Sequence, residues 1–408
     1  MADSAESQWP ARAASLLRRE AATQATFVEL FFDLFVLFTL TRLVAYGVAN
    51  LSPEGRPADR WITVARLLLM LLTLIWAWTV ITYLTARFDP KRPVVQVFVV
   101  ATAFGLLIMG ASVAHAFDGR AAGFAEPYVI IQFVRTLALA LMLRGHALQL
   151  PFLRATVWYG LAAVPWLVGV ATGSQARIAL WSCALLIDLG SARLGWPLPG
   201  MKRERITTWA AHPRYLAGRF EQLQMIALGE PLLAVGIVFS QKPASPYRVA
   251  SLVTAFLTTV LLWRIYYHLA GESLPDALAA TADRARIGRI VAAAHIAMIS
   301  GIIANGLGHE IVQSFPTGHT DPAWLAMIIG GPLVYLTGRA LLERVVFFRI
   351  APRWRLTIVA LLLLAAPSLV LPPIAVAAAS GLILLTIAVA DTRHSWNRPG
   401  PPTPPPMT

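Results

Sequence analysis

The sequence predicts an all-α fold: a polytopic integral membrane helix bundle of about 12 transmembrane helices in two parallel six-helix halves. Of the 408 residues, 57% are hydrophobic and only 13% are charged. Soluble domains carry about 25% charged residues. Apolar stretches of about 20 residues, the length that crosses a bilayer, recur along almost the whole chain. These observations exclude a soluble enzyme, a nucleic-acid-binding module and a disulfide-stapled secreted domain.

Twelve apolar spans follow one another, separated by short polar connections. They cover residues 27–50, 61–84, 94–117, 127–149, 152–172, 176–196, 214–239, 249–270, 289–312, 323–342, 355–371 and 373–391. The first span is too long, and carries too many acids, to be the apolar part of a signal peptide. Pro372 and Pro373 leave two interpretations open for the last two spans, a tight hairpin or one broken helix.

A basic connection at 197–213 divides the chain into a first half, 27–196, and a second half, 214–391. An even number of spans in each half gives both halves the same orientation, so any repeat is parallel rather than inverted. We expect residues 1–26 to form a cytoplasmic segment. The proline-rich residues 392–408 are typical of a disordered cytoplasmic tail.

The Lys and Arg residues lie mostly on one side of the predicted spans. The N-terminus and every second connection after it carry 23 of them, and the opposite side carries 6. Because Lys and Arg of short loops are retained in the cytoplasm, both termini are predicted to be cytoplasmic. We therefore expect a multi-pass protein of the cell membrane (the plasma or inner membrane), in contact with the lipid bilayer. The net charge of +13 is explained by this retention, and no nucleic-acid partner is expected.

Motifs for familiar chemistry are missing from the sequence. Cys183 is the only cysteine, which excludes an internal disulfide and a thiolate zinc site. The three lysines lie in polar connections, so no retinal Schiff base forms within a helix. There is no phosphate-binding loop, GxSxG or HExxH motif, and no short ligand motif supports a metal site of His268, Glu272 and His295. We expect no cofactor and no metal, and assign no catalytic residue.

Ionisable residues inside the spans are the main functional signal, because each costs about 2.5–3.5 kcal/mol at a helix centre. At a rise of about 1.5 Å per residue, these residues are expected to lie in two layers of the membrane. The inner layer contains Asp33, Asp188, Arg264, His268 and His295. The outer layer contains Arg42, Arg135 and Glu230. With two further charged residues on the first and seventh spans, the candidates for an ion or substrate pathway are Glu29, Asp33, Arg42, Arg135, Arg219, Glu230, Arg264, His268 and His295.

Acids and bases of equal depth are expected to pair across helices. Asp33 should lie within about 4 Å of Arg264 or His268, directly or through one water, and Arg42 should meet Glu230. The alternative is that the buried charges are structural ion pairs that fix helix register.

Several other polar residues are interpreted more simply. Asp188 is a lone acid near a helix end, and we interpret it as structural. His309 and Glu310 lie near the outer end of a span, where solvated groups are ordinary. Trp78, in the middle of the second span, is interpreted as a packing residue.

Pro231 directly follows the buried acid Glu230. A proline inside a helix removes one backbone hydrogen bond, which here frees the carbonyl of Ala227. Discontinuous helices of transporters build ion sites from such carbonyls. A kink with no functional role is the alternative.

Two segments carry a recognisable pattern: residues 27–43 (FVELFFDLFVLFTLTRL) and residues 212–230 (HPRYLAGRFEQLQMIALGE). They resemble the two signatures of the low temperature requirement protein A (LtrA) family, at the start of each half. Gly218 stands where the family usually has an acid before the Arg-Phe pair. The resemblance implies an integral membrane protein linked by name to growth in the cold, with no established reaction. The positions that match the family's polar residues are Glu29, Asp33, His212, Arg219 and Glu230.

Our leading functional hypothesis is a transporter or ion-conducting protein for an ion or small-molecule solute, with Asp33 and Glu230 as its central acids. The competing class is a membrane-embedded enzyme that acts on a lipid or another hydrophobic substrate. In that class Asp33, His268 and His295 would serve as acid and base groups. A third class is a structural protein whose ion pairs serve only folding.

Overall fold

The computed structural model describes residues 15–18, 24–51, 56–200, 213–241, 243–267, 274, 276, 284–347 and 350–396. These residues form helices and one isolated β-bridge, between Leu17 and Phe88. The helices up to residue 200 are α3 (Phe27–Asn50), α4 (Pro57–Arg87), α5 (Pro93–Ser112), the 3-10 turn η1 (Val113–His115), α6 (Ala121–Met142), α7 (Gln149–Val170) and α8 (Ser174–Arg193). Those that follow are α9 (Pro213–Ser240), α10 (Pro246–Tyr266), α12 (Arg284–Ser314), α13 (Pro322–Ile328), α14 (Gly330–Phe347), α15 (Pro352–Ala365), the 3-10 turn η4 (Pro367–Leu369) and α16 (Pro373–Trp396).

Among the described residues, each expected span coincides with a helix or with two consecutive short ones, which confirms an all-helical, polytopic fold. Residues 268–270 of the span expected at 249–270 lie outside the described ranges. Within the described ranges, nine segments are long and apolar enough to cross a membrane, α4, α7, α10 and α16 among them. The helices α3 and α8, with 24 and 20 residues, carry three charged side chains each. The 14 residues of α15 rise about 21 Å, less than the roughly 30 Å of a hydrocarbon core.

The chain forms two compact units. Unit 1 consists of Met1–Leu43 and Arg66–Leu216, and unit 2 of Val44–Ala65 and Ala217–Thr408. Unit 1 therefore contains α5 to α8 together with most of α3 and α4. Unit 2 contains α10 to α16 and nearly all of α9.

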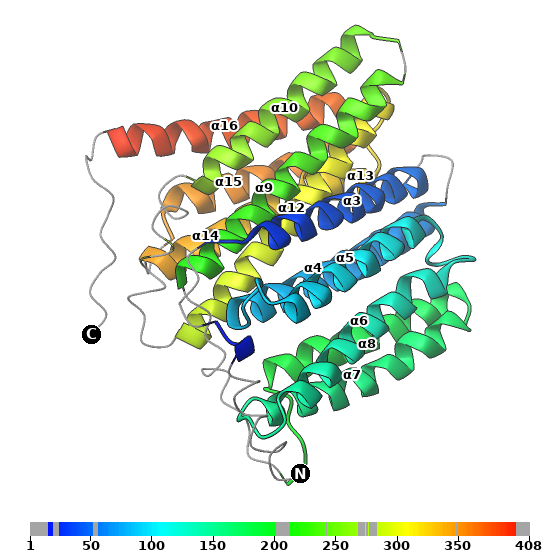
Figure 1. Cartoon of the computed structure of the whole chain (residues 1–408). Coiled ribbons are helices and arrows are strands. Elements are labelled where there is room, and N and C mark those ends of the chain that lie inside the picture. Colours follow the sequence, from blue (N-terminus) through cyan, green and yellow to red (C-terminus); the bar gives the residue numbers. More distant parts are fainter. Residues whose placement is uncertain are drawn as a thin grey trace, which may run out of the picture. The chain divides into compact units, whose positions relative to one another are not determined.

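In unit 1, helices that follow one another in the chain pack side by side: α5 against α6, α6 against α7, and α7 against α8 (Figure 1). Aromatic side chains fill the space between α6, α7 and α8. Phe124 of α6 stacks on Trp181 of α8 with ring centroids 5.5 Å apart, and Trp166 of α7 lies 5.2 Å from Trp181. Such large, geometrically matched rings fix how the three helices pack.

Arg177, in the first turn of α8, donates hydrogen bonds to backbone carbonyls at the ends of α7 and η1. Its guanidinium donates to the carbonyl oxygens of Gly169 at 2.9 Å and Thr172 at 2.7 Å, at the end of α7. It also donates to the carbonyl of Ala116, directly after η1, at 3.1 Å, and lies 5.8 Å from the Trp181 ring centroid. Since carbonyls at a helix C-terminus have no partner within the helix, one buried side chain satisfies several of them.

In unit 2, α12 and α14 run antiparallel and touch backbone to backbone. A Cβ added to Gly301 would lie 2.5 Å from the backbone nitrogen of Tyr335, and one added to Gly331 would lie 2.5 Å from that of Asn305. At Gly338 it would lie 2.6 Å from the carbonyl oxygen of Ala294. We call Gly301, Gly331 and Gly338 the glycine seam. Small residues at such contacts let membrane helices approach closely.

Two side chains of α14 connect that helix to α10 and α15. The Tyr335 hydroxyl donates to the carbonyl of Leu262 at 2.6 Å, and Arg339 Nε donates to that of Ile265 at 2.9 Å. The Arg339 guanidinium also lies 4.9 Å from the ring centroid of Trp354, on α15. These hydrogen bonds to backbone carbonyls fix the last turn of α10 against α14.

Two breaks follow from prolines. The span expected at 323–342 is divided into α13 and α14, because Pro332 has no N–H to bond the carbonyl of Ile328. Of the two interpretations left open for the final spans, the hairpin is correct. The helices α15 and α16 are separate and pack against each other.

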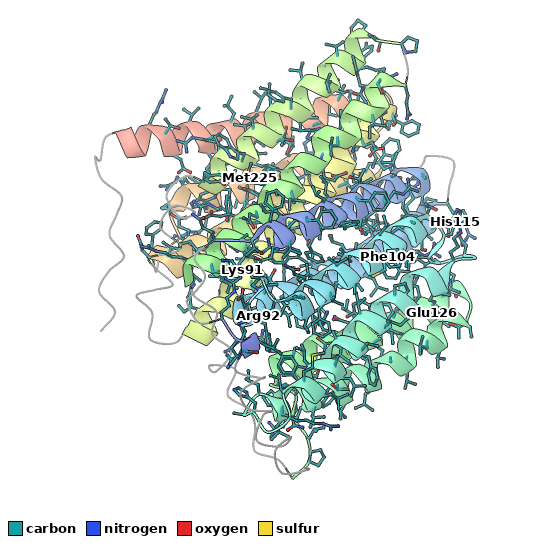
Figure 2. The ribbon with its side chains drawn as sticks, viewed as in Figure 1. Lys91, Arg92, Phe104, His115, Glu126 and Met225 are labelled. Carbon is teal, nitrogen blue, oxygen red and sulfur yellow. The ribbon has the colours of Figure 1, made fainter. Side chains whose placement is uncertain are left out.

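The outer surfaces of the helices are apolar and their ends are polar. In unit 1, Lys91 and Arg92 lie at one end of α5 and His115 at the other (Figure 2). Phe104 lies between them, 61% exposed, and in unit 2 Met225 of α9 is 46% exposed. Contiguous exposed apolar side chains of this kind indicate a lipid environment.

Candidate functional site

The candidate residues from the sequence are distributed over both units. Unit 1 holds Glu29, Asp33, Arg42 and Arg135. Unit 2 holds Arg219, Glu230, Arg264 and His295. The described ranges do not include His212, His268 or Glu272. The expected pairs of Asp33 with Arg264 and of Arg42 with Glu230 each join residues of different units, and both stay predictions.

Glu29 fixes the start of α3. Its Oε2 accepts hydrogen bonds of 2.7 Å from both the backbone N–H and the hydroxyl of Thr26, and the first of these is the glutamate half of a capping box. Its Oε1 accepts a hydrogen bond from the Tyr215 hydroxyl, and Arg18 lies 3.7 Å from Oε2. The Tyr215 hydroxyl is also 2.8 Å from that of Thr85, on α4. These contacts give the buried carboxylate a structural role.

Asp33, one turn further along α3, is 3% exposed. Its Oδ1 accepts a hydrogen bond of 3.0 Å from the indole N–H of Trp78, on α4. Trp78 is fully buried, so it packs as the sequence suggested. It is also a polar partner of this acid, which hydropathy alone did not indicate.

Asp188 belongs to a buried chain of hydrogen bonds that ends at Arg135. The Tyr128 hydroxyl donates to Asp188 Oδ2 at 2.7 Å, and Gln132 Nε2 donates to the Tyr128 hydroxyl at 3.4 Å. Arg135 donates to Gln132 Oε1. Donors therefore follow one direction, from the cation on α6 to the carboxylate on α8, and such chains polarise and strengthen their members.

This chain corrects two sequence interpretations. Asp188 is not an isolated acid near a helix end, since it is 1% exposed and connected to Arg135. The separation into inner and outer layers also fails for these two residues, because Tyr128 and Gln132 bridge them. In the described part of the chain, Asp188 Oδ1 and Arg135 Nη1 have no hydrogen-bond partner.

Glu230 is fully buried on α9, directly before Pro231. A Cβ added to Gly306 of α12 would lie 2.8 Å from Glu230 Oε2 and 2.9 Å from Pro231 Cγ, so the carboxyl group occupies the space that this glycine leaves. Within unit 2, neither carboxyl oxygen has a hydrogen-bond partner among the described residues. Glu310, one turn after Gly306 on α12, is near enough to act on Glu230 electrostatically.

The expectation that His309 and Glu310 are solvated is wrong. They are 4% and 7% exposed. The reason is that α13 covers this end of α12: a Cβ added to Gly308 would lie 3.0 Å from the Ile328 backbone. Both ring nitrogens of His309 and one carboxyl oxygen of Glu310 have no hydrogen-bond partner in the ranges that are described. The sequence showed that a histidine and an acid lie near the end of this span. It did not show that α13 packs over them.

His295 is also fully buried, and both of its ring nitrogens have partners. One contacts the Tyr266 hydroxyl at 3.1 Å and the other the carbonyl of Val291 at 2.8 Å. Phe220 of α9 stacks on the ring with centroids 4.6 Å apart. A histidine held in this way fixes α9, α10 and α12 together. Among the residues that the structure describes, no three His, Cys, Asp or Glu side chains converge to hold a metal ion.

The remaining cations lie at different levels of burial. Arg219 is fully buried and donates to Gln222 Oε1 at 2.8 Å. Arg42 and Arg264 are each half-buried, and Arg264 donates to the Thr392 hydroxyl at 3.4 Å.

The buried polar residues of α3 and α9 lie in the part of the chain that matches a known protein family. The family model described as "Bacterial low temperature requirement A protein (LtrA)" matches residues 24–389. The chain belongs to the LtrA family. A relative from Rhizobium meliloti (strain 1021), named "Uncharacterized protein RA0937", is 28% identical over 385 residues, which cover 91% of this chain and 90% of the relative. No solved structure matches.

The LtrA signature residues differ in their surroundings. In the first LtrA segment, Glu29 and Asp33 have hydrogen-bond donors in unit 1. In the second, Tyr215 donates to Glu29, so residues from both LtrA segments meet at the start of α3. Glu230, the last residue of the second LtrA segment, lacks a hydrogen-bond donor among the described residues of its unit.

Proposed function

We propose that this LtrA-family protein transports or conducts a cation or a proton across the membrane, with Glu230 as the acid that binds it. The observation that carries the proposal is a fully buried carboxyl group with no hydrogen-bond partner among the described residues of unit 2. Burying a carboxylate without compensation is costly, so it binds a cation or takes up a proton. Either event is the elementary step of cation or proton movement.

The surroundings of Glu230 support the same proposal. Glu310 adds a second acid within electrostatic range, which strengthens the attraction of the site for a cation. Pro231 cannot donate to the carbonyl of Ala227, so that oxygen is free to act as a further ligand. Two carboxyl groups and a backbone carbonyl are the oxygen ligands that hard monovalent cations prefer.

The test is flux into liposomes that contain the purified protein, with proton, sodium and potassium gradients imposed one at a time. We expect one of these gradients to drive flux through the wild-type protein. Glu230→Gln should lower that flux at least tenfold, because it removes the ionisable group while keeping its size. Glu126→Gln is the matched control, since Glu126 is an exposed glutamate of α6 (Figure 2), and its flux should equal that of the wild type.

Two results would contradict the proposal. One is a folded, reconstituted wild-type protein that moves none of the three ions. The other is undiminished flux through Glu230→Gln. Release of a modified lipid by the wild-type protein, without ion flux, would instead favour the membrane-embedded enzyme.

We also propose that the protein lies in the cell membrane with both termini in the cytoplasm and with its two six-helix halves parallel. The support is the distribution of Lys and Arg, 23 on one side and 6 on the other. Reporter fusions should place residues 197–213 in the cytoplasm and residues 240–248 outside. An external position for residues 197–213 would overturn this orientation.

A further inference from the structure

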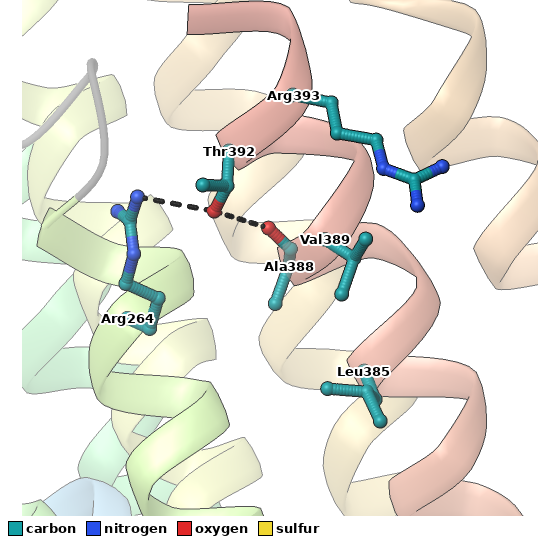
Figure 3. A pocket seen from close by; sticks show the side chains of 6 residues that line it. All are labelled: Arg264, Leu385, Ala388, Val389, Thr392 and Arg393. Carbon is teal, nitrogen blue, oxygen red and sulfur yellow. Dashed lines mark hydrogen bonds between the residues drawn. The ribbon is translucent and has the colours of Figure 1, made fainter. Parts of the chain in front are cut away.

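A pocket of about 410 Å³ lies between α10 and α16 of unit 2 (Figure 3). Its lining residues are Arg264, Leu385, Ala388, Val389, Thr392 and Arg393. They combine two cations and a hydroxyl with three apolar side chains, and no acid is among them. Glu230 is not among these lining residues. An inference about this pocket is therefore independent of the proposed transport function.

The cationic part of this pocket has more hydrogen-bond donors than the surrounding side chains use. The Arg264 guanidinium carries five N–H donors, and it bonds the Thr392 hydroxyl at 3.4 Å (Figure 3). Among the described residues, no carboxylate forms an ion pair with Arg264 or Arg393. Both arginines lie within the last turn of their helices, which end at Tyr266 and Trp396. Arginines at the ends of membrane helices lie at the level of the lipid headgroups.

The apolar part of the pocket continues onto the outer surface of the same helices. Leu385 and Val389, on α16, are 44% and 40% exposed, and Leu382, one turn before Leu385, is 63% exposed. On α10, Val260 and Trp263 are 38% and 42% exposed. In a membrane protein these side chains contact lipid tails, so the pocket opens toward the acyl chains. The Arg264 guanidinium lies on the α10 side of the pocket, and the Arg393 guanidinium points away from it (Figure 3).

We propose that this pocket binds an anionic phospholipid. Its phosphate lies against Arg264 beside Thr392, Arg393 adds a second positive charge at the same end of α16, and one acyl chain follows Leu385 and Val389. Arginine bonds phosphate oxygens in a bidentate manner, and basic pockets between membrane helices suit anionic headgroups. A free phosphate would use the arginines but leave the apolar wall without a partner, and for this reason the structure favours the lipid.

The experiment measures binding of phosphatidylglycerol to the purified full-length protein by native mass spectrometry and by the shift of the thermal unfolding midpoint. Phosphatidylcholine and inorganic phosphate are the comparison ligands. We expect the wild type to bind phosphatidylglycerol at least tenfold more tightly than phosphatidylcholine, and to show no unfolding shift with inorganic phosphate.

Variants of the pocket separate its two parts. The double variant Arg264→Gln, Arg393→Gln should lose the preference for phosphatidylglycerol. Val389→Trp should weaken binding by filling the apolar part without changing the charge. Arg193→Gln is the matched control, an exposed arginine at the end of α8, and should bind as the wild type does.

Three outcomes would overturn the proposal. The first is unchanged phosphatidylglycerol binding by the double variant. The second is equal binding of phosphatidylcholine and phosphatidylglycerol by the wild type. The third is an unfolding shift with inorganic phosphate as large as that with the lipid, which would assign the arginines to a soluble anion. Should the double variant fail to fold, Val389→Trp decides between loss and retention of binding.

Discussion

Gly331→Ala is expected to lower the thermal unfolding midpoint of the purified protein strongly, or to prevent its recovery in folded form. The added Cβ would lie 2.5 Å from the backbone nitrogen of Asn305. A backbone atom cannot move aside as the end of a flexible side chain can, so α12 and α14 must separate along their length. Overpacking a core costs about 1–3 kcal/mol, and we expect the upper end of that range. Differential scanning fluorimetry in detergent measures the effect.

The neighbouring residue provides the control for this substitution. A Cβ at Gly330 meets nothing within 4 Å, so Gly330→Ala should leave the midpoint unchanged or raise it slightly, since alanine favours helix. Equal midpoints for the two variants would show that the close contact of α12 and α14 is absent in solution.

Arg177→Ala is expected to destabilise unit 1 by several kcal/mol. Each buried carbonyl left without a donor costs about 1–3 kcal/mol, and Arg177 donates to the carbonyls of Ala116 and Thr172. It also donates to that of Gly169, which keeps a second donor in the Thr172 hydroxyl. Arg177→Lys should recover only part of the loss, because an ammonium group does not reproduce the spread of donors of a guanidinium. The free energy of unfolding in denaturant, followed by tryptophan fluorescence, reports the change directly.

Arg193→Ala serves as the matched variant on the same helix. Arg193 is exposed near the end of α8, and exposed substitutions usually change stability by less than about 0.5 kcal/mol. If both arginine variants unfolded alike, the role assigned to Arg177 would be wrong.

The helix starts were predictable because prolines mark them. The helices α9, α10, α13, α15 and α16 begin at Pro213, Pro246, Pro322, Pro352 and Pro373. The expected spans begin within three residues of these positions. Proline suits the first position of a helix, where its missing N–H is not needed. The break at Ile329 was not predicted, because the same proline rule also tolerates Pro127, Pro165 and Pro231 inside helices.

The buried charges could be located from the sequence, but their partners could not. Charge counting pairs acids with bases, whereas Asp33 and Asp188 accept hydrogen bonds from the uncharged donors Trp78 and Tyr128. These donors are 45 and 60 residues away from the acids in the chain. Tryptophan and tyrosine inside apolar spans have the same hydropathy pattern whether they pack or donate. Only the arrangement of the helices distinguishes the two roles.

The glycine seam also restricts how unit 2 can move. If α14 slid past α12 by one helical turn, about 5.4 Å, Asn305 would face the backbone at Tyr335 instead of that of Gly331. Both positions would then carry side chains at a spacing that only glycine allows. The two helices therefore cannot slide along each other while they stay in contact. In any conformational change they must move together as one rigid body. Any bending within unit 2 has to take place at another joint, such as the interrupted turn of α9 at Pro231.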